Sequence, residues 1–144
     1  MKRIAFCDKY IHYLAMPPDE EKDDDRLHFN ERMMAELDKR YDLLKYPKFN
    51  IHRIRKDYPI DGIVTHITLD DSLNEEQELF YKAYPSEIKQ AKEEFPEMKI
   101  LAYTDREKGM DYITLMECGI DDVLWRDPEK YDEQIEIILK WVDG

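Results

Sequence analysis

Short apolar runs recur along the chain, and each stops at a polar or charged residue. Runs of this length that are rich in branched and aromatic side chains are typical of buried strands. The second run alternates only loosely between apolar and polar positions, and the others are more continuous. The pattern predicts strands at Arg3–Cys7, Phe49–Ile54, Gly62–Ile67, Met98–Tyr103 and Asp122–Trp125.

Between these runs, apolar residues recur every three or four positions, which is the period of a helix with one buried face. Asn30 is a candidate N-cap for a helix that begins at Glu31 and is ended by Lys45–Pro47. Two further helices are expected at Ser86–Glu94 and Lys108–Cys118. Between the second and third predicted strands there is room for little or no helix.

The last helix is marked by an apolar stripe with helical spacing. Gly119 would end the preceding helix in a left-handed conformation, and Pro128 is suited to the first turn of the last one. The stripe consists of Tyr131, Ile135, Ile138 and Val142.

Strands that alternate with helices predict a doubly wound α/β domain with a mostly parallel, five-stranded sheet between two helical layers. In such a sheet the functional edge lies at the carboxyl ends of the strands. Asp8, His66, Thr104 and Arg126 all fall at or just after predicted strand ends. We therefore expect these four side chains to lie close together at the carboxyl edge of the sheet, which we call the mouth.

The composition suits one domain spanning residues 1–144. The chain has 144 residues, 42% hydrophobic and 39% charged, and its net charge is −12. An acidic surface repels nucleic-acid phosphate and anionic lipid, so neither is expected as a partner. A protein partner with a basic surface is the better complement, and a homodimer is the alternative.

The sequence favours a cytoplasmic location. Cys7 and Cys118 match no zinc or redox spacing, so both are expected to be reduced thiols. No apolar run is long enough for a membrane span, and the N-terminus lacks a signal-peptide core.

An acidic loop insertion is expected near residues 17–28, where Asp19–Asp25 reads DEEKDDD. A run with this density of charge has few apolar side chains to bury. It is therefore interpreted as a solvated loop that is dispensable for folding. The alternative interpretation is an acidic docking segment.

Four stretches together resemble the receiver domain of two-component response regulators, which has a flavodoxin-like fold. They are RIAFCD, DGIVTHI, KILAYT and ECGIDDVLWRDP, and the last two carry most of the resemblance. A receiver holds Mg²⁺ on two acids after its first strand and accepts phosphate on an Asp after its third. A Thr or Ser and a Lys follow its fourth and fifth strands.

The resemblance assigns receiver positions in this chain and shows where the chemistry has changed. Asp8 matches the first acid and Thr104 the hydroxyl, but Lys9 replaces the second acid. His66 falls on the phosphoacceptor position, and Arg126 replaces the family's Lys. A metal-dependent acyl phosphate cannot form on a histidine, so these changes imply a pseudoreceiver.

Two further departures accompany these changes. Asp105 places an acid after the hydroxyl residue, where it would repel phosphate, and Val123 stands in place of the family's switch aromatic. The resemblance implies a regulatory module that needs no phosphorylation, has no cofactor or catalytic activity, and acts through a protein partner. The implied contact face contains Tyr112, Leu115, Val123 and Tyr131.

Two other functions remain open on sequence grounds. One is a small α/β enzyme, or a metal-binding or ligand-binding protein, that uses Asp8, His66 and Asp70. The other is an acidic inhibitor or decoy that binds a basic protein. At the mouth itself we expect Arg126 to pair with Asp8 in place of a metal, and His66 to be hydrogen-bonded to a neighbour.

Overall fold

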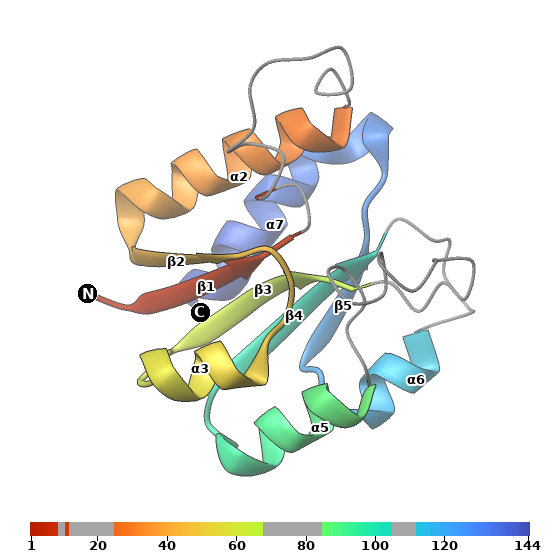
Figure 1. Ribbon diagram of the computed structural model, residues 1–144. Coiled ribbons are helices and arrows are strands. Elements are labelled where there is room, and N and C mark those ends of the chain that lie inside the picture. Colours follow the sequence, from red (N-terminus) through yellow and green to blue (C-terminus); the bar gives the residue numbers. More distant parts are fainter. Residues whose placement is uncertain (9–10, 12–24, 68–84, 105–111) are drawn as a thin grey trace.

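The computed structural model describes residues 1–8, 11, 25–67, 85–104 and 112–144. Within them, five parallel strands form one sheet in the order β2-β1-β3-β4-β5 (Figure 1). The strands are β1 (Arg3–Cys7), β2 (Asp42–Tyr46), β3 (Gly62–His66), β4 (Lys99–Thr104) and β5 (Asp122–Trp125).

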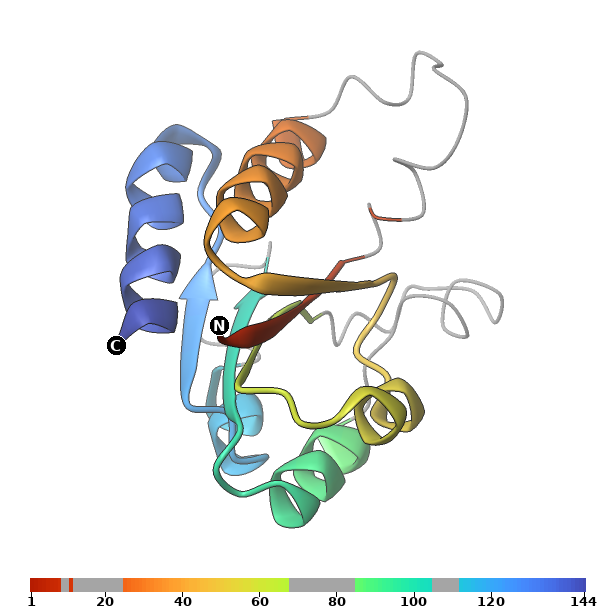
Figure 2. The ribbon, with the colours of Figure 1, turned by 90° about the vertical axis from the view of Figure 1, so that its left-hand side faces the viewer.

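Helices cover both faces of this sheet, as Figures 1 and 2 show. One face carries α2 (Asp25–Arg40) and α7 (Tyr131–Asp143). The other carries α3 (Ile51–Asp57), α5 (Pro85–Glu94) and α6 (Tyr112–Glu117). The predicted doubly wound α/β fold, with a five-stranded sheet between two helical layers, is confirmed.

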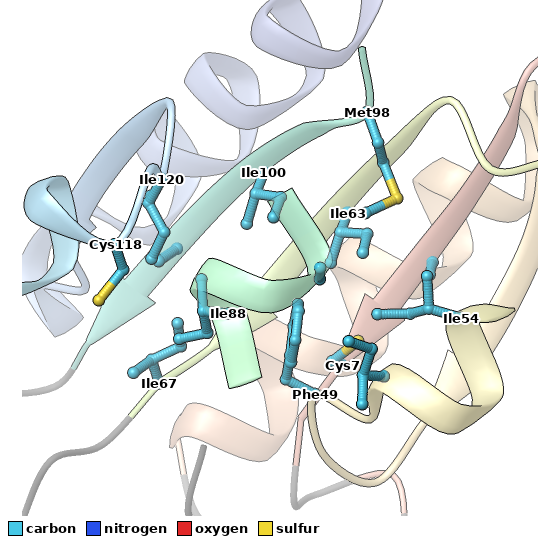
Figure 3. Close-up of a cluster of buried hydrophobic side chains, with 14 of the residues drawn as sticks. Cys7, Phe49, Ile54, Ile63, Ile67, Ile88, Met98, Ile100, Cys118 and Ile120 are labelled. Atoms are coloured by element: carbon cyan, nitrogen blue, oxygen red, sulfur yellow. The ribbon is translucent and has the colours of Figure 1, made fainter. Parts of the chain in front are cut away.

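Two hydrophobic cores lie on opposite faces of the sheet because successive side chains of a strand point to opposite sides. In β1, Ala5 and Cys7 face the layer of α3, α5 and α6, whereas Ile4 and Phe6 face α2 and α7. Figure 3 shows the first core, in which Phe49 and Ile88 meet the sheet. Burial on both faces explains why most strands are nearly continuous apolar runs.

The prediction for the second strand is wrong. The strand is β2 at Asp42–Tyr46, and most of the segment predicted as a strand begins helix α3. Asn50 starts this helix, since its side chain accepts hydrogen bonds from the backbone N–H groups of His52 and Arg53. The connection between β2 and β3 therefore contains a helix, contrary to the expectation that there was no room for one.

The predicted start of the first long helix is also wrong. Helix α2 begins at Asp25 rather than Glu31 and ends at Arg40. Asn30 is therefore not its cap but a fully buried residue within it. The last four residues of the insertion predicted near 17–28 belong to the first turn of α2, and residues 17–24 lie outside the described residues.

The C-terminal half follows the prediction closely. The bounds of β5 are as expected, and Gly119 has a φ of 94° after α6. Pro128 opens a short 3-10 turn that leads into α7. Among the described residues, no helix is both long and apolar enough to cross a membrane.

The N-cap of α3 gives a direct test of the corrected fold. Asn50→Ala should lower the free energy of unfolding by about 1 kcal/mol, because two N–H groups of the first turn lose their acceptor. Urea unfolding measures the loss. Asn50→Asp keeps the acceptor and should retain most of the stability. Equal stability of the alanine variant and the wild type would contradict a helix that starts here.

Candidate functional site

The carboxyl ends of the parallel strands bring the four predicted polar residues to one edge of the sheet. Asp8 directly follows β1, His66 ends β3, Thr104 ends β4 and Arg126 directly follows β5. The register places His66 beside Tyr103 and Thr104 beside Trp125. All four predicted residues are buried, so this mouth is a packed site rather than an open one.

Arg126 lies at the centre of the mouth, with a side chain that is 0% exposed. Its Nη1 lies 3.6 Å from Asp8 Oδ2 and donates a hydrogen bond of 3.1 Å to Asn30 Oδ1. The guanidinium carbon lies 5.2 Å from the ring centre of Phe29 and 4.9 Å from that of Tyr103. A carboxylate, an amide and two aromatic rings therefore take the place of water around this cation.

Asp8 is held from a second side as well. The Tyr103 hydroxyl donates a 2.5 Å hydrogen bond to its Oδ2, the oxygen that faces Arg126. Its backbone N–H donates to the carbonyl of Tyr46, which keeps it in line with the sheet. Each buried charge of the pair is thus offset by the opposite charge beside it.

His66 and Thr104 complete the described part of the mouth. His66 is 7% exposed, and its ring centre lies 5.5 Å from that of Tyr103. Thr104 is also buried, and its carbonyl accepts a hydrogen bond from the backbone N–H of Arg126. The other predicted mouth residues, Lys9, Asp70 and Asp105, lie outside the described residues.

A second layer of side chains surrounds Asp8 and Arg126 and was not predicted from the sequence. It consists of Phe29, Asn30 and Tyr103. Asn30 fits the apolar spacing of Met33, Met34 and Leu37, and that spacing was the available signal that it points inward. Its Nδ2 is a buried donor with no hydrogen-bond partner in the part of the chain that the structure describes. Taking Asn30 as a cap hid this role.

The residues predicted to form a contact face do not all reach the surface. Leu115 is fully buried in the core under α6, so its prediction as a surface contact is wrong. Val123 is half-buried against the same core, and Tyr131 packs against Phe29 at 5.0 Å between ring centres. The side chain of Tyr112 lies outside the described part. Ile113 and Met116 of α6 are instead the exposed apolar residues, at 66% and 38%.

The two thiols are buried. Burial strongly raises the pKa of Cys7 and also raises the pKa of Cys118, so both stay protonated at neutral pH. Within the described residues, no group of three His, Cys, Asp or Glu side chains is placed to hold a metal ion.

Known proteins resemble this chain in structure. No family model and no curated protein matches the sequence. A response regulator from Thermotoga maritima has a TM-score of 0.61 at 14% identity, and the match covers 99% of this chain and 98% of that one. The fold is that of a receiver domain.

Two further matches agree. A CheY-like receiver domain protein from Methanospirillum hungatei has a TM-score of 0.59 at 14% identity, covering 99% of this chain and 97% of that one. A two-component response regulator from Clostridium difficile gives 0.58 at 14% identity, with 100% of both chains covered. At such identities the likeness establishes the receiver fold alone.

The buried pair predicts strong coupling between Asp8 and Arg126. Asp8→Asn or Arg126→Met alone should each lower the free energy of unfolding by about 3 kcal/mol, because each leaves one buried charge without its partner. The double variant should recover at least about 1 kcal/mol of the summed loss. A double-mutant cycle by urea unfolding at neutral pH measures this coupling. Strict additivity would contradict the pair's importance.

Proposed function

We propose that this chain is a receiver-like regulatory module that works without phosphorylation and acts by binding a partner protein. The observation that carries the proposal is the buried Arg126, whose guanidinium lies 3.6 Å from Asp8. By the resemblance, Asp8 stands where a receiver binds its metal. Here a side chain of the protein itself supplies the positive charge that a metal would bring.

The acceptor position supports the same conclusion. His66 stands where the resemblance places the phosphoacceptor Asp, and it is buried beside Tyr103. The hydroxyl of Tyr103 also donates to Asp8, which strengthens the hold on that carboxylate. In a receiver, metal and cation neutralise the developing phosphoryl charge. Because Arg126 already supplies positive charge beside Asp8, phosphate transfer at this mouth is disfavoured.

The contact surface is proposed on α6 and the adjoining edge strand β5. Ile113 and Met116 are exposed on α6, and Val123 of β5 is half-buried against the core below them. The exposed apolar area of a helix that borders an edge strand is stabilised when a partner covers it. A second copy of the chain or a different protein would satisfy this surface, and sedimentation distinguishes them.

Phosphate transfer is the first test. We expect no phosphate adduct after incubation with acetyl phosphate and Mg²⁺, because no acceptor Asp occupies the position of His66. Intact mass spectrometry measures the adduct, and a receiver domain with its acceptor Asp serves as the positive control. A stoichiometric adduct that hydroxylamine removes would overturn phosphorylation independence.

The contact face is the second test. Ile113→Glu should abolish binding of a partner retained from a lysate of the source cells, or dissociate a dimer of the chain, because it places a charge in an apolar contact. Ile137→Glu is the matched control, since Ile137 is 49% exposed on α7 in the other helical layer. Affinity capture measures binding of a partner protein, and sedimentation velocity measures dissociation of a dimer. Equal behaviour of both variants would count against the α6 face.

A further inference from the structure

The outward face of α3 is basic in an otherwise acidic protein. Ile51 and Ile54 point into the core, so His52, Arg53 and Lys56 lie on the opposite, exposed side. The stretch Lys45–Lys56 has five Lys and Arg residues and no Asp or Glu. The rest of the chain must therefore carry seventeen more negative than positive charges to reach the net charge of −12.

Arg53 differs from the other described arginines in its contacts with carboxylates. The other arginines whose side chains the structure describes each lie within ion-pair distance of a carboxylate. They are Arg3, Arg32, Arg40, Arg55 and Arg126. Among the described side chains, Arg53 has no such partner, although the chain has 34 acidic residues. Its guanidinium carbon instead lies 5.5 Å from the ring centre of Tyr46.

The position of Arg53 also opposes the local electrostatics of the helix. It is the third residue after the cap Asn50, in a first turn that contains no acidic residue. The N-terminal turn of a helix favours negative charge, and Glu is preferred at this position. Lys56 lies three residues further on the same face, so the two cations also repel each other. A charged residue whose position does not stabilise its own helix is typical of a binding site.

The frame that carries these cations is rigid. The Tyr46 hydroxyl donates a 2.6 Å hydrogen bond to Asp57 Oδ2, which fixes the ring under Arg53 to the end of α3. Arg3 Nη1 donates to the carbonyl of the same Asp57 at 2.6 Å. Glu87 of α5 accepts from the backbone N–H of Ile51 at 2.9 Å. A charged surface held in this way loses little conformational freedom when a ligand binds.

We propose that His52, Arg53 and Lys56 form a docking surface for a short acidic segment of a partner protein. A guanidinium presents paired donors that match a carboxylate, and Lys56 adds a second charge next to it. This surface is separate from the apolar face of α6 and does not depend on it.

The size of the basic face favours a short peptide over nucleic acid. Duplex DNA carries about one negative charge per 1.7 Å, so it would extend beyond this face over the acidic remainder of the molecule. At physiological salt the screening length is about 8 Å, so a short segment feels mainly the basic face itself. The net charge of −12 had pointed to a basic partner, but that average hides this local reversal.

Fluorescence anisotropy with a labelled peptide of alternating Glu and Gly tests the proposal at physiological ionic strength, where the acidic remainder of the molecule is screened. The wild type should bind the peptide, and Arg53→Glu and Lys56→Glu should each weaken binding by about tenfold or more. Lys140→Glu is the matched control, because it makes the same charge change on an exposed residue of α7, in the other layer, and should bind like the wild type.

Folding does not confound the Arg53→Glu variant of this test. Arg53→Glu places an acid at the third position after the cap, so its free energy of unfolding should be unchanged or raised. Equal peptide binding by the wild type and both variants, or no binding by the wild type, would overturn the proposal. Tighter binding of a single-stranded oligonucleotide that is lost in the same variants would overturn the assignment to an acidic protein segment.

Discussion

Burial of Arg126 is the constraint on which the mouth of this domain depends. A guanidinium that is 0% exposed needs charge and hydrogen-bond partners from the protein, and they come from several elements. Asp8 follows β1 and pairs with Arg126, Asn30 of α2 accepts a hydrogen bond from it, and the ring of Tyr103 in β4 lies against it. The hydrogen bond from Arg126 to Asn30 therefore ties helix α2 to the carboxyl edge of the sheet. The cost of burying one cation is met by three separate segments that must all be in place.

The buried pair of Asp8 and Arg126 has consequences for how such a domain can be regulated. A receiver responds when a phosphoryl group changes the charge balance at the ends of its strands. Here Asp8 already has Arg126 and the hydroxyl of Tyr103 as partners. Information is more readily received at exposed surfaces, and α6 and α3 offer two that differ in chemistry. The first exposes the apolar side chains of Ile113 and Met116, and the second exposes cations.

The three central strands and the edge strand β5 could be predicted from the sequence, and the edge strand β2 could not. The strands β1, β3 and β4 are largely apolar because helices cover both of their faces. The edge strand β2 reads DLLKY and is largely half-buried or exposed, so it lacks that signal. In α3 the buried pair Ile51 and Ile54 is too short a pattern to separate a helix from a loosely alternating strand.

Some residues of the site could likewise be predicted from the sequence and others could not. Residues at strand ends were predictable because a parallel sheet brings its carboxyl ends to one edge, whatever the helices do. Asn30 and Leu115 were not, because their roles depend on how a helix is rotated against the sheet. A residue such as Arg53 is hidden for another reason, since net charge sums over the whole chain. Arg53 stands out only among the described side chains, where Arg3 and Arg55 each lie beside a carboxylate and Arg53 lies against the ring of Tyr46.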